Sequence, residues 1–256
     1  MVRHPPSPAR GLPPAASQPL NDSAPGCGVA GAAPPDVRVA RERLEAEGLT
    51  VERGDRQLLH GLALVVESGQ AIELTGPNGC GKTTLLRVLA GLCLADTGSV
   101  RWCGSPIAEV RPEWHAALAW LGHLDGLKAE LTAFDNLALE AGVSAPAALH
   151  ALAQVGLAAA AEVEAGRLSA GQRRRLALAR VLLSARRIWL LDEPFTALDV
   201  DGRALVRRLM IEHVTAGGML VYSNHHDEGI GLARRLALPP PIEIGANPIE
   251  IGEQPT

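Results

Sequence analysis

The stretch Gly76-Pro77-Asn78-Gly79-Cys80-Gly81-Lys82-Thr83-Thr84 decides the fold. It fits the pattern G-x-x-x-x-G-K-[ST], in which consecutive backbone N–H groups converge on phosphate groups. The glycines permit this backbone path because they have no Cβ, and all nine residues are candidates for binding a nucleotide. Lys82 can reach the β- and γ-phosphates, and the Thr83 hydroxyl suits a Mg²⁺ ligand.

The residues on either side give this loop the context that the motif requires. Ala71–Thr75 is predicted to be a short strand, and Thr84–Ala90 an amphipathic helix whose positive N-terminus faces the phosphates. A glycine-rich turn that binds nothing would not need this strand, this helix and the Lys-Thr pair. We therefore predict that the chain binds ATP or GTP.

Composition narrows the class of partner and the compartment. The chain has 256 residues, a net charge of −4 and a pI of about 6.1, so nothing in its charge favours nucleic acid or an anionic membrane. Its four cysteines form no C-x-x-C pair, and a free Cys80 inside the phosphate loop suits a reducing compartment, so we predict the cytoplasm. The uncharged run 141–161 is too weakly apolar to span a membrane. Any membrane association would therefore go through another protein.

Both ends of the chain differ in composition from the middle. Residues 1–35 are rich in Pro, Ala, Gly and Ser, and we predict a disordered extension or a start codon assigned too far upstream. Residues 239–256 form a Pro-rich tail with a short direct repeat, 241–245 and 248–252, which suggests a small β-hairpin. The predicted nucleotide-binding domain covers 36–238, with strands near 37–39, 49–51, 61–66 and 98–102, and helices from about Pro112 to Gly166.

A second cluster carries the chemistry. Ile188–Leu191 is a continuous apolar run, as expected of a central parallel strand, and it ends in Asp192-Glu193 at the edge where such sheets bind ligands. Two acids after a strand are usually a solvated turn, but here a phosphate loop lies upstream in the same domain. We predict that Asp192 holds Mg²⁺ and that Glu193 is the catalytic base for the attacking water.

The two clusters together resemble the nucleotide-binding domain of ABC transporters, over roughly Val37 to Leu238. Leu168-Ser169-Ala170-Gly171-Gln172 looks like the ABC signature, with Ser169 capping a helix, and Ala197-Leu198-Asp199 looks like the D-loop. The resemblance implies an α/β P-loop NTPase fold with a parallel core sheet, an antiparallel β subdomain and a helical subdomain at about 112–185. It also implies Mg-ATP as cofactor.

The same resemblance implies a homodimer and assigns further residues. In this family two domains pair head to tail, so Ser169 and Gly171 would complete the nucleotide site of the other subunit. His225 follows the predicted strand Met219–Val221, where the family has its switch histidine, and His226 is the alternative.

Two positions depart from the family pattern. His123 stands where the family usually has a glutamine; its imidazole could accept a water or face the metal as a catalytic group, or it could only pack at the interface. Arg53 stands near the position of the aromatic that stacks on adenine, and its planar guanidinium could stack there instead.

The departures indicate a subfamily. Gly122-His123, Gly126–Thr132 and Asp135-Asn136-Leu137 look like the CcmA family, the ATP-binding subunits of the bacterial cytochrome c maturation system. This implies a complex with the membrane subunits CcmB, CcmC and CcmD on the cytoplasmic face of the inner membrane. There ATP hydrolysis would drive haem export, or release of the haem-loaded chaperone CcmE.

Two other functions share parts of this pattern. The ATPase subunit of another ABC exporter would carry the same catalytic residues. A soluble ABC ATPase acting on ribosomes or DNA usually has two nucleotide domains, coiled-coil arms or a basic patch, and this sequence shows one signature, one phosphate loop and no heptad run. No C-x-x-C-H motif is present, so haem specificity would belong to the partners.

Overall fold

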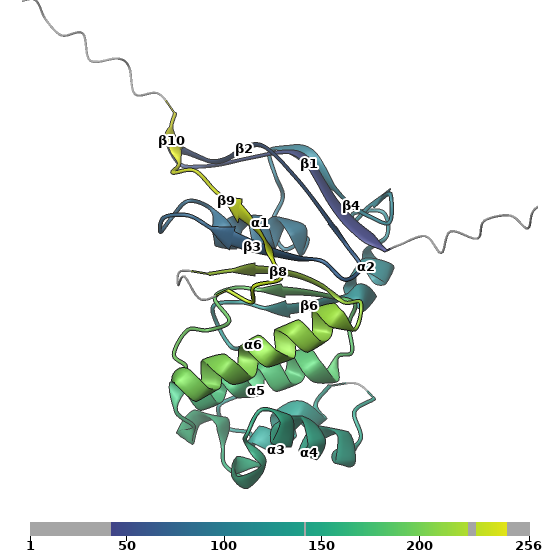
Figure 1. Cartoon of the computed structure of the whole chain (residues 1–256), viewed down its shortest axis with the longest axis vertical. Helices are drawn as coiled ribbons and strands as arrows, with labels where there is room; N and C mark the ends of the chain where they lie inside the picture. The colour runs from purple at the N-terminus through teal and green to yellow at the C-terminus, as the bar shows by residue number, and fades with distance from the viewer. Residues whose placement is uncertain (1–41, 141, 225–228, 245–256) are drawn as a thin grey trace, which may run out of the picture. The chain divides into compact units, whose positions relative to one another are not determined.

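Two five-stranded sheets make up the β structure of the computed structural model, which describes residues 42–140, 142–224 and 229–244. The first sheet is antiparallel, in the order β10-β2-β1-β4-β5 (Figure 1). Its long hairpin joins β1 (Arg43–Arg53) to β2 (Arg56–Glu67) through the two-residue turn Gly54-Asp55. Its other strands are β4 (Thr97–Trp102), β5 (Ser105–Pro106) and β10 (Ile242–Glu243).

The second sheet is parallel and lies at the centre of the fold, in the order β6-β7-β8-β3-β9. Every residue of β7 (Ile188–Leu191) and β8 (Met219–Ser223) is buried, as expected of parallel strands covered on both faces. The other three strands are β3 (Ala71–Thr75), β6 (Leu118–Leu121) and β9 (Arg234–Ala237).

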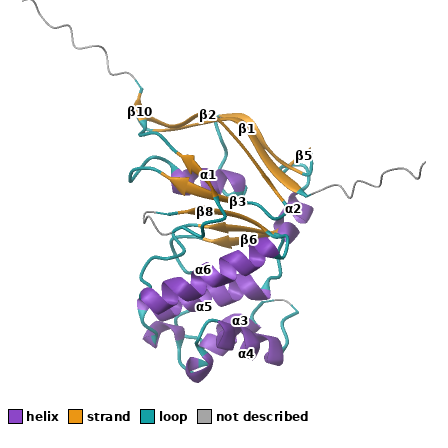
Figure 2. Cartoon of the chain, in the orientation of Figure 1, coloured by secondary structure: helices purple, strands orange, loops and turns teal. Residues whose placement is uncertain are grey.

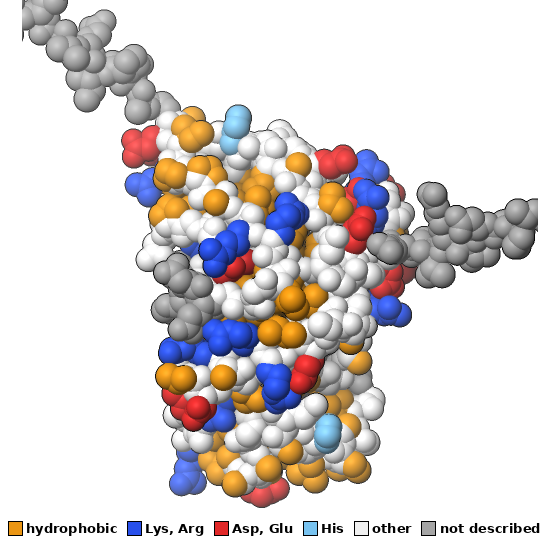
Figure 3. All heavy atoms as spheres, viewed as in Figure 1, with side chains coloured by type: hydrophobic (Ala, Val, Ile, Leu, Met, Phe, Trp, Pro, Cys, Tyr) orange, Lys and Arg blue, Asp and Glu red, His pale blue; other side chains and the backbone are white. Residues whose placement is uncertain are grey.

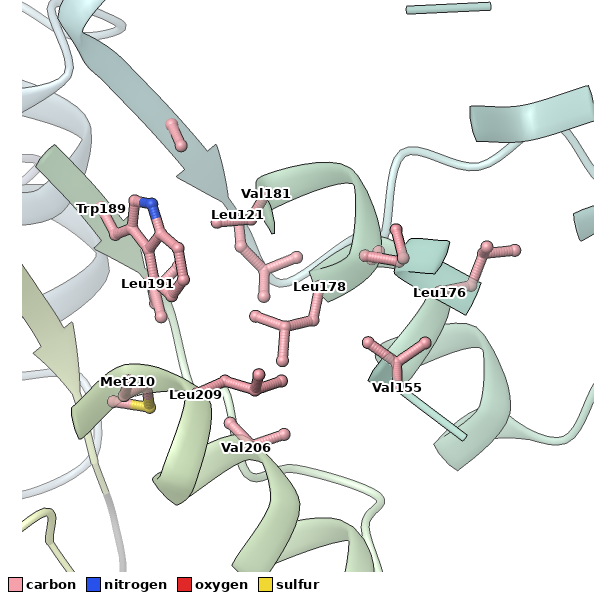
Figure 4. Close-up of a cluster of buried hydrophobic side chains, with 14 of the residues drawn as sticks. Leu121, Val155, Leu176, Leu178, Val181, Trp189, Leu191, Val206, Leu209 and Met210 are labelled. Atoms are coloured by element: carbon pink, nitrogen blue, oxygen red, sulfur yellow. The ribbon is translucent and has the colours of Figure 1, made fainter. Parts of the chain in front are cut away.

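Helices cover both faces of the parallel sheet (Figure 2). One face packs on α1 (Lys82–Leu89) and on the antiparallel sheet, and the other packs on α5 (Ala170–Leu183) and α6 (Val200–Thr215). Side chains alternate between the two faces of a strand. Ile188 and Leu190 therefore pack into the core on the α1 side of the sheet (the first core), whereas Trp189 and Leu191 pack into the core on the side of α5 and α6 (the second core). Figure 4 shows this second core, where β7 meets Val206, Leu209 and Met210 of α6.

The helical part continues the second core. It consists of α3 (Ala133–Ala138), α4 (Ala145–Gln154), two 3₁₀ turns (Ala158–Ala160 and Ala165–Arg167) and the N-terminal half of α5. Thr132 and Ser144 cap α3 and α4 through their hydroxyls, and Ala148, Ala151 and Leu152 pack α4 onto the core.

The structure corrects the predicted helical region. The range from Pro112 onward begins with α2 (Arg111–Ala117), but the next four residues form β6, an edge strand of the parallel sheet. A four-residue apolar run cannot be told from a helix segment by periodicity, which is why this strand was missed. The helical part therefore starts after β6, at Ala133.

The ends of the domain differ from the prediction at one point. Ile242–Glu243 lies beyond Leu238, where the domain was predicted to end, and pairs with Gln57 and Arg56 of β2 as an added edge strand. The predicted extension 1–35, the predicted strand 37–39 and the second half of the repeat lie outside the described residues. Among the described residues, no helix is both long enough and apolar enough to cross a bilayer.

Candidate functional site

A cavity of about 690 Å³ lies over the loop between β3 and α1. Six of the nine predicted loop residues line it, together with Leu58 of β2 and Glu193: Asn78, Gly79, Gly81, Lys82, Thr83 and Thr84. Gly76 is required by packing, because a Cβ there would lie 2.5 Å from the Leu238 carbonyl oxygen. Cys80 is fully buried beneath the loop. The loop thus presents its backbone and its Lys-Thr pair to the cavity.

Lys82 is held against the loop that carries it. Its Nζ donates hydrogen bonds to the carbonyl oxygens of Gly76 (2.8 Å) and Pro77 (3.0 Å). A third, longer contact joins Nζ to Cys80 Sγ (3.9 Å), so each of the three N–H donors of the ammonium has a partner within the loop. Lys82 also lines the cavity, where an anion would compete for these donors.

Asp192 lies behind the cavity at the end of β7 and is almost completely buried. Its carboxylate accepts from the Thr83 hydroxyl, at 2.9 Å to Oδ2 and 3.1 Å to Oδ1, and from the Ser223 hydroxyl at 2.7 Å. Hydroxyl and carboxylate oxygens are the ligands that Mg²⁺ prefers. In the described part of the chain no three His, Cys, Asp or Glu side chains gather as a metal cage. Thr83 and Asp192 fit a metal that takes its remaining ligands from phosphate and water.

Glu193 is held in a conformation that few residues adopt. Its φ is +50°, in the left-handed region, which is uncommon and costly for a residue with a Cβ. Its N–H donates to Ser223 Oγ (2.8 Å), and its carboxylate accepts from the Thr196 hydroxyl (3.1 Å). Glu193 also lines the cavity, so these contacts hold its carboxylate at the cavity wall.

Two residues of this arrangement were not predicted. Ser223 ends β8, and its hydroxyl accepts from the backbone N–H of Glu193 and donates to the carboxylate of Asp192, the two residues that follow β7. Arg174 of α5 lies on the other side of the same strand end and donates to the carbonyl oxygens of Asp192 and Glu193. A charged residue on the buried face of α5, beside Ala177, Leu178 and Val181, was a signal that could have identified Arg174.

The signature residues lie away from the cavity. Ser169 caps α5 in a capping box with Gln172, and its side chain is exposed. Gly171 lies so close to the loop after Glu193 that a Cβ would stand 2.8 Å from the Ala197 carbonyl oxygen. Neither residue lines the cavity, and the nucleotide contact predicted for them remains a prediction.

Three further candidates have different outcomes. His123 lies in the loop after β6, is exposed, and does not line the cavity. Arg53 lies at the end of β1, where its guanidinium donates to the Glu52 carbonyl oxygen and to Cys93 Sγ. His225 and His226 lie outside the described residues. The roles predicted for these residues remain predictions.

A buried carboxylate lies on β3, next to the end of β8. Glu73 accepts from Asn224 Nδ2 (2.8 Å) and pairs with Arg235 Nε (3.1 Å). Burial raises the pKa of the neighbouring Tyr222 to about 12. Arg235 belongs to a group of arginines on α6 and β9 that Figure 3 shows on one face of the molecule.

His213 of α6 is a second perturbed group, remote from the cavity. Its ring stacks on Trp189 with centroids 3.9 Å apart, and Nε2 lies 3.1 Å from the Met219 carbonyl oxygen. Burial lowers the pKa of His213, and its backbone hydrogen bonds oppose this only in part. The folded protein therefore favours the neutral imidazole.

Comparisons with known proteins indicate the family of this chain. The family model described as ABC transporter matches residues 59–196. The chain is 46% identical over 203 residues to the cytochrome c biogenesis ATP-binding export protein CcmA of Nitrosococcus oceani, covering 78% of this chain and 93% of that protein. It is also 46% identical over 197 residues to the CcmA of Salmonella typhi, covering 76% of this chain and 96% of the relative.

Solved structures show the same fold. A putative ABC transporter ATP-binding protein from Pyrococcus furiosus aligns with a TM-score of 0.68 and 26% identity, over 77% of this chain and 97% of that one. A bacterial Atm1-family ABC exporter with ATP bound aligns with a TM-score of 0.72 and 25% identity, over 80% of this chain and 39% of that one. The predicted fold class and family resemblance are thereby confirmed. The chain belongs to the ABC transporter family and, within it, to the CcmA family of cytochrome c biogenesis ATP-binding proteins.

Proposed function

We propose that this chain hydrolyses ATP for a CcmA-type transporter complex in cytochrome c maturation. One observation carries the chemistry: Glu193 and Thr83 line the cavity over the phosphate loop, and Asp192 lies behind it, bonded to the Thr83 hydroxyl. The nucleotide's phosphates would lie along the loop backbone and Lys82. The CcmA relatives favour ATP over GTP, since they are named ATP-binding export proteins.

Glu193 would orient the attacking water and accept its proton. The carboxylate is half-buried and held by Thr196, so its position relative to the γ-phosphate would be fixed before the nucleotide arrives. Thr83 and Asp192 would hold Mg²⁺, which when bound neutralises charge on the phosphate oxygens. Lys82 would bind the same oxygens from the side of the loop.

The active unit in this proposal is a homodimer. Ser169 and Gly171 lie outside the cavity of their own subunit, so a head-to-tail pair would bring them to the nucleotide of the other. The exposed N-terminus of α5 at Ser169 would then face a phosphate. His225 would contact the γ-phosphate, and His123 would lie near the metal.

The partners in this proposal are the membrane subunits CcmB, CcmC and CcmD, and indirectly the haem chaperone CcmE. Hydrolysis would drive haem export or release of haem-loaded CcmE, and the chain would lie on the cytoplasmic face of the inner membrane, held there by these partners. Support comes from the names of the CcmA relatives and from their coverage along nearly their full length.

The test is haem staining of c-type cytochromes and of CcmE in cells whose only copy carries Glu193→Gln. Loss of cytochromes with haem retained on CcmE is expected, because the variant would bind ATP without turning it over. The control is Glu162→Gln, the same chemical change at an exposed position away from the cavity. Normal cytochromes in Glu193→Gln cells would refute the maturation role and leave an ABC ATPase of another transporter.

A second test separates binding from hydrolysis in the purified chain. Lys82→Ala is expected to weaken ATP binding, because the cavity loses the ammonium that faces the phosphates. Glu193→Gln is expected to bind ATP with nearly unchanged affinity. Rapid hydrolysis by the Glu193→Gln variant would remove this residue from the role of base.

A further inference from the structure

Arg174 of α5 connects two segments that are far apart in sequence. Its guanidinium donates from NH1 to the Gly122 carbonyl oxygen (2.8 Å) and to Asp125 Oδ1 (3.1 Å), both in the loop after β6. From NH2 it donates to the carbonyl oxygens of Asp192 and Glu193, the latter at 2.8 Å. The residue is only 5% exposed. One buried cation therefore holds the loop after β6 and the end of β7 together.

The geometry of the guanidinium makes this connection stiff. Its N–H groups are fixed in one plane, so the contacts at NH1 and NH2 cannot change independently. A shift of the loop at Gly122 and Asp125 would turn the whole plane and weaken the bonds to Asp192 and Glu193. Since one of these bonds is to the carbonyl oxygen of Glu193, a shift in it would move the backbone that carries the carboxylate of the proposed base.

A second arginine of α5 holds the other end of the same loop. Arg180 donates from NH1 to the Gly126 carbonyl oxygen (2.8 Å) and pairs through Nε and NH2 with Glu140 (2.9 and 2.7 Å). Between the two anchors, the side chain of Leu124 is 83% exposed. The backbone of 122–126 is thus tied to α5 at both ends, while Leu124 and His123 remain at the surface.

We propose that Arg174 is a positioning residue that makes the rate of ATP hydrolysis depend on the loop 122–126, with Asp125 as its charge partner. The inference rests on the proposed ATPase function of the cavity. It does not involve nucleotide affinity, because Arg174 does not line the cavity and contacts none of the nine loop residues in the bonds described. The expected signature is a loss of turnover at unchanged ATP affinity.

The experiment uses the full-length chain purified in complex with its membrane subunits and measures kcat and the Kd for Mg-ATP. Arg174→Met is expected to lower kcat by about tenfold or more, with Kd within about twofold of wild type. Arg174→Lys keeps the positive charge but loses the planar guanidinium, so its kcat is expected to lie between that of Arg174→Met and that of wild type. Wild-type kcat in Arg174→Lys would overturn the proposal, since charge alone would then suffice.

Asp125 gives a test that does not require a change in the core. Its side chain is 23% exposed, and Asp125→Ala removes one contact of Arg174 on the loop side. This variant is expected to lower kcat by about three- to tenfold. The double variant Asp125→Ala/Arg174→Met is expected to be no slower than Arg174→Met alone, because both act through one connection. Unchanged kcat in Asp125→Ala would overturn the proposal even if Arg174→Met fails to fold. Where Arg174→Met folds, multiplied effects in the double variant would overturn it as well.

The control is Arg208→Met, which removes an exposed arginine paired with Glu212 on the surface of α6 and is expected to leave kcat and Kd unchanged. Absence of ATPase activity in the wild-type complex would refute the proposed function itself. If the wild-type complex hydrolyses ATP and Arg174→Met has the same kcat, only the role of Arg174 would be refuted.

Discussion

Replacing Ser223 by alanine is expected to lower both stability and turnover. The hydroxyl is fully buried, accepts from the N–H of Glu193 and donates to the carboxylate of Asp192. A bond between neutral groups contributes about 1 kcal/mol and one to a charged group about 1.5–3 kcal/mol, so the free energy of unfolding should fall by about 2.5–4 kcal/mol. For a domain of this size that corresponds to a decrease in Tm of about 5–15 °C.

The assay compares thermal unfolding and ATP turnover of Ser223→Ala with those of Ser184→Ala. Ser184 at the end of α5 donates one local bond to the Val181 carbonyl oxygen, so its replacement tests the loss of a hydroxyl without the contact to the two acids. Turnover of Ser223→Ala is expected to fall about ten- to a hundredfold, because Glu193 loses the bond that fixes its N–H. A Tm within about 2 °C of the Ser184→Ala variant, or wild-type turnover, would refute this account.

Three other changes test separate parts of the structure. Glu73→Ala is expected to cost about 2 kcal/mol in urea unfolding, because it removes the buried hydrogen bond from Asn224 Nδ2 to the Glu73 carboxylate, whereas the exposed Glu212→Ala should cost little. Gly171→Ala is expected to cost about 1–3 kcal/mol, since its Cβ would stand 2.8 Å from the Ala197 carbonyl oxygen; an unchanged melting curve would contradict this contact. The Tm is expected to fall between about pH 7.5 and about pH 5.5 through His213. The pKa of His213 in the folded state lies below 6.5, so the unfolded state binds more protons as the pH falls. The contribution of the neutral His213 to stability is therefore fully present above pH 6.5 and is lost as the pH falls through the lower pKa of the folded state. His213→Gln should flatten this dependence, and an equally steep one would assign it to other groups.

The parts of the fold that could be predicted are those whose cause is local. The loop 76–84 and the run Ile188–Leu191 each carry their own signal in residue type and spacing, and both lie where they were expected. The capping box at Ser169 is likewise a short-range pattern. β6 was missed because it contains four residues and owes its strand conformation to pairing with β7. For β10, the repeat suggested a small β-hairpin, but its pairing with β2 could not be predicted from two residues.

The candidate site was predictable only in part, for the same reason. Lys82, Thr83, Asp192 and Glu193 stand in recognisable motifs, and the structure brings them together around one cavity. Ser223 and Arg174 bond to the backbone of Glu193 from 30 and 19 residues away in the sequence. Neither residue belongs to a motif whose chemistry predicts this contact. Such contacts become visible only when the strands and α5 are placed in space.

The conformation of Glu193 explains why the residues missed from sequence matter for function. A left-handed backbone at a residue with a Cβ costs about 1–2 kcal/mol, so it persists only where several contacts require it. Ser223 holds its N–H, Arg174 holds its carbonyl oxygen and Thr196 holds its carboxylate. At about 1 kcal/mol or more each, these bonds together offset the strain, whereas one alone would barely do so. Because they come from β8, α5 and the loop after β7, the position of the proposed base depends on all three elements. Turnover should therefore respond to a change in any of them, while ATP binding, which depends on the loop between β3 and α1, should not.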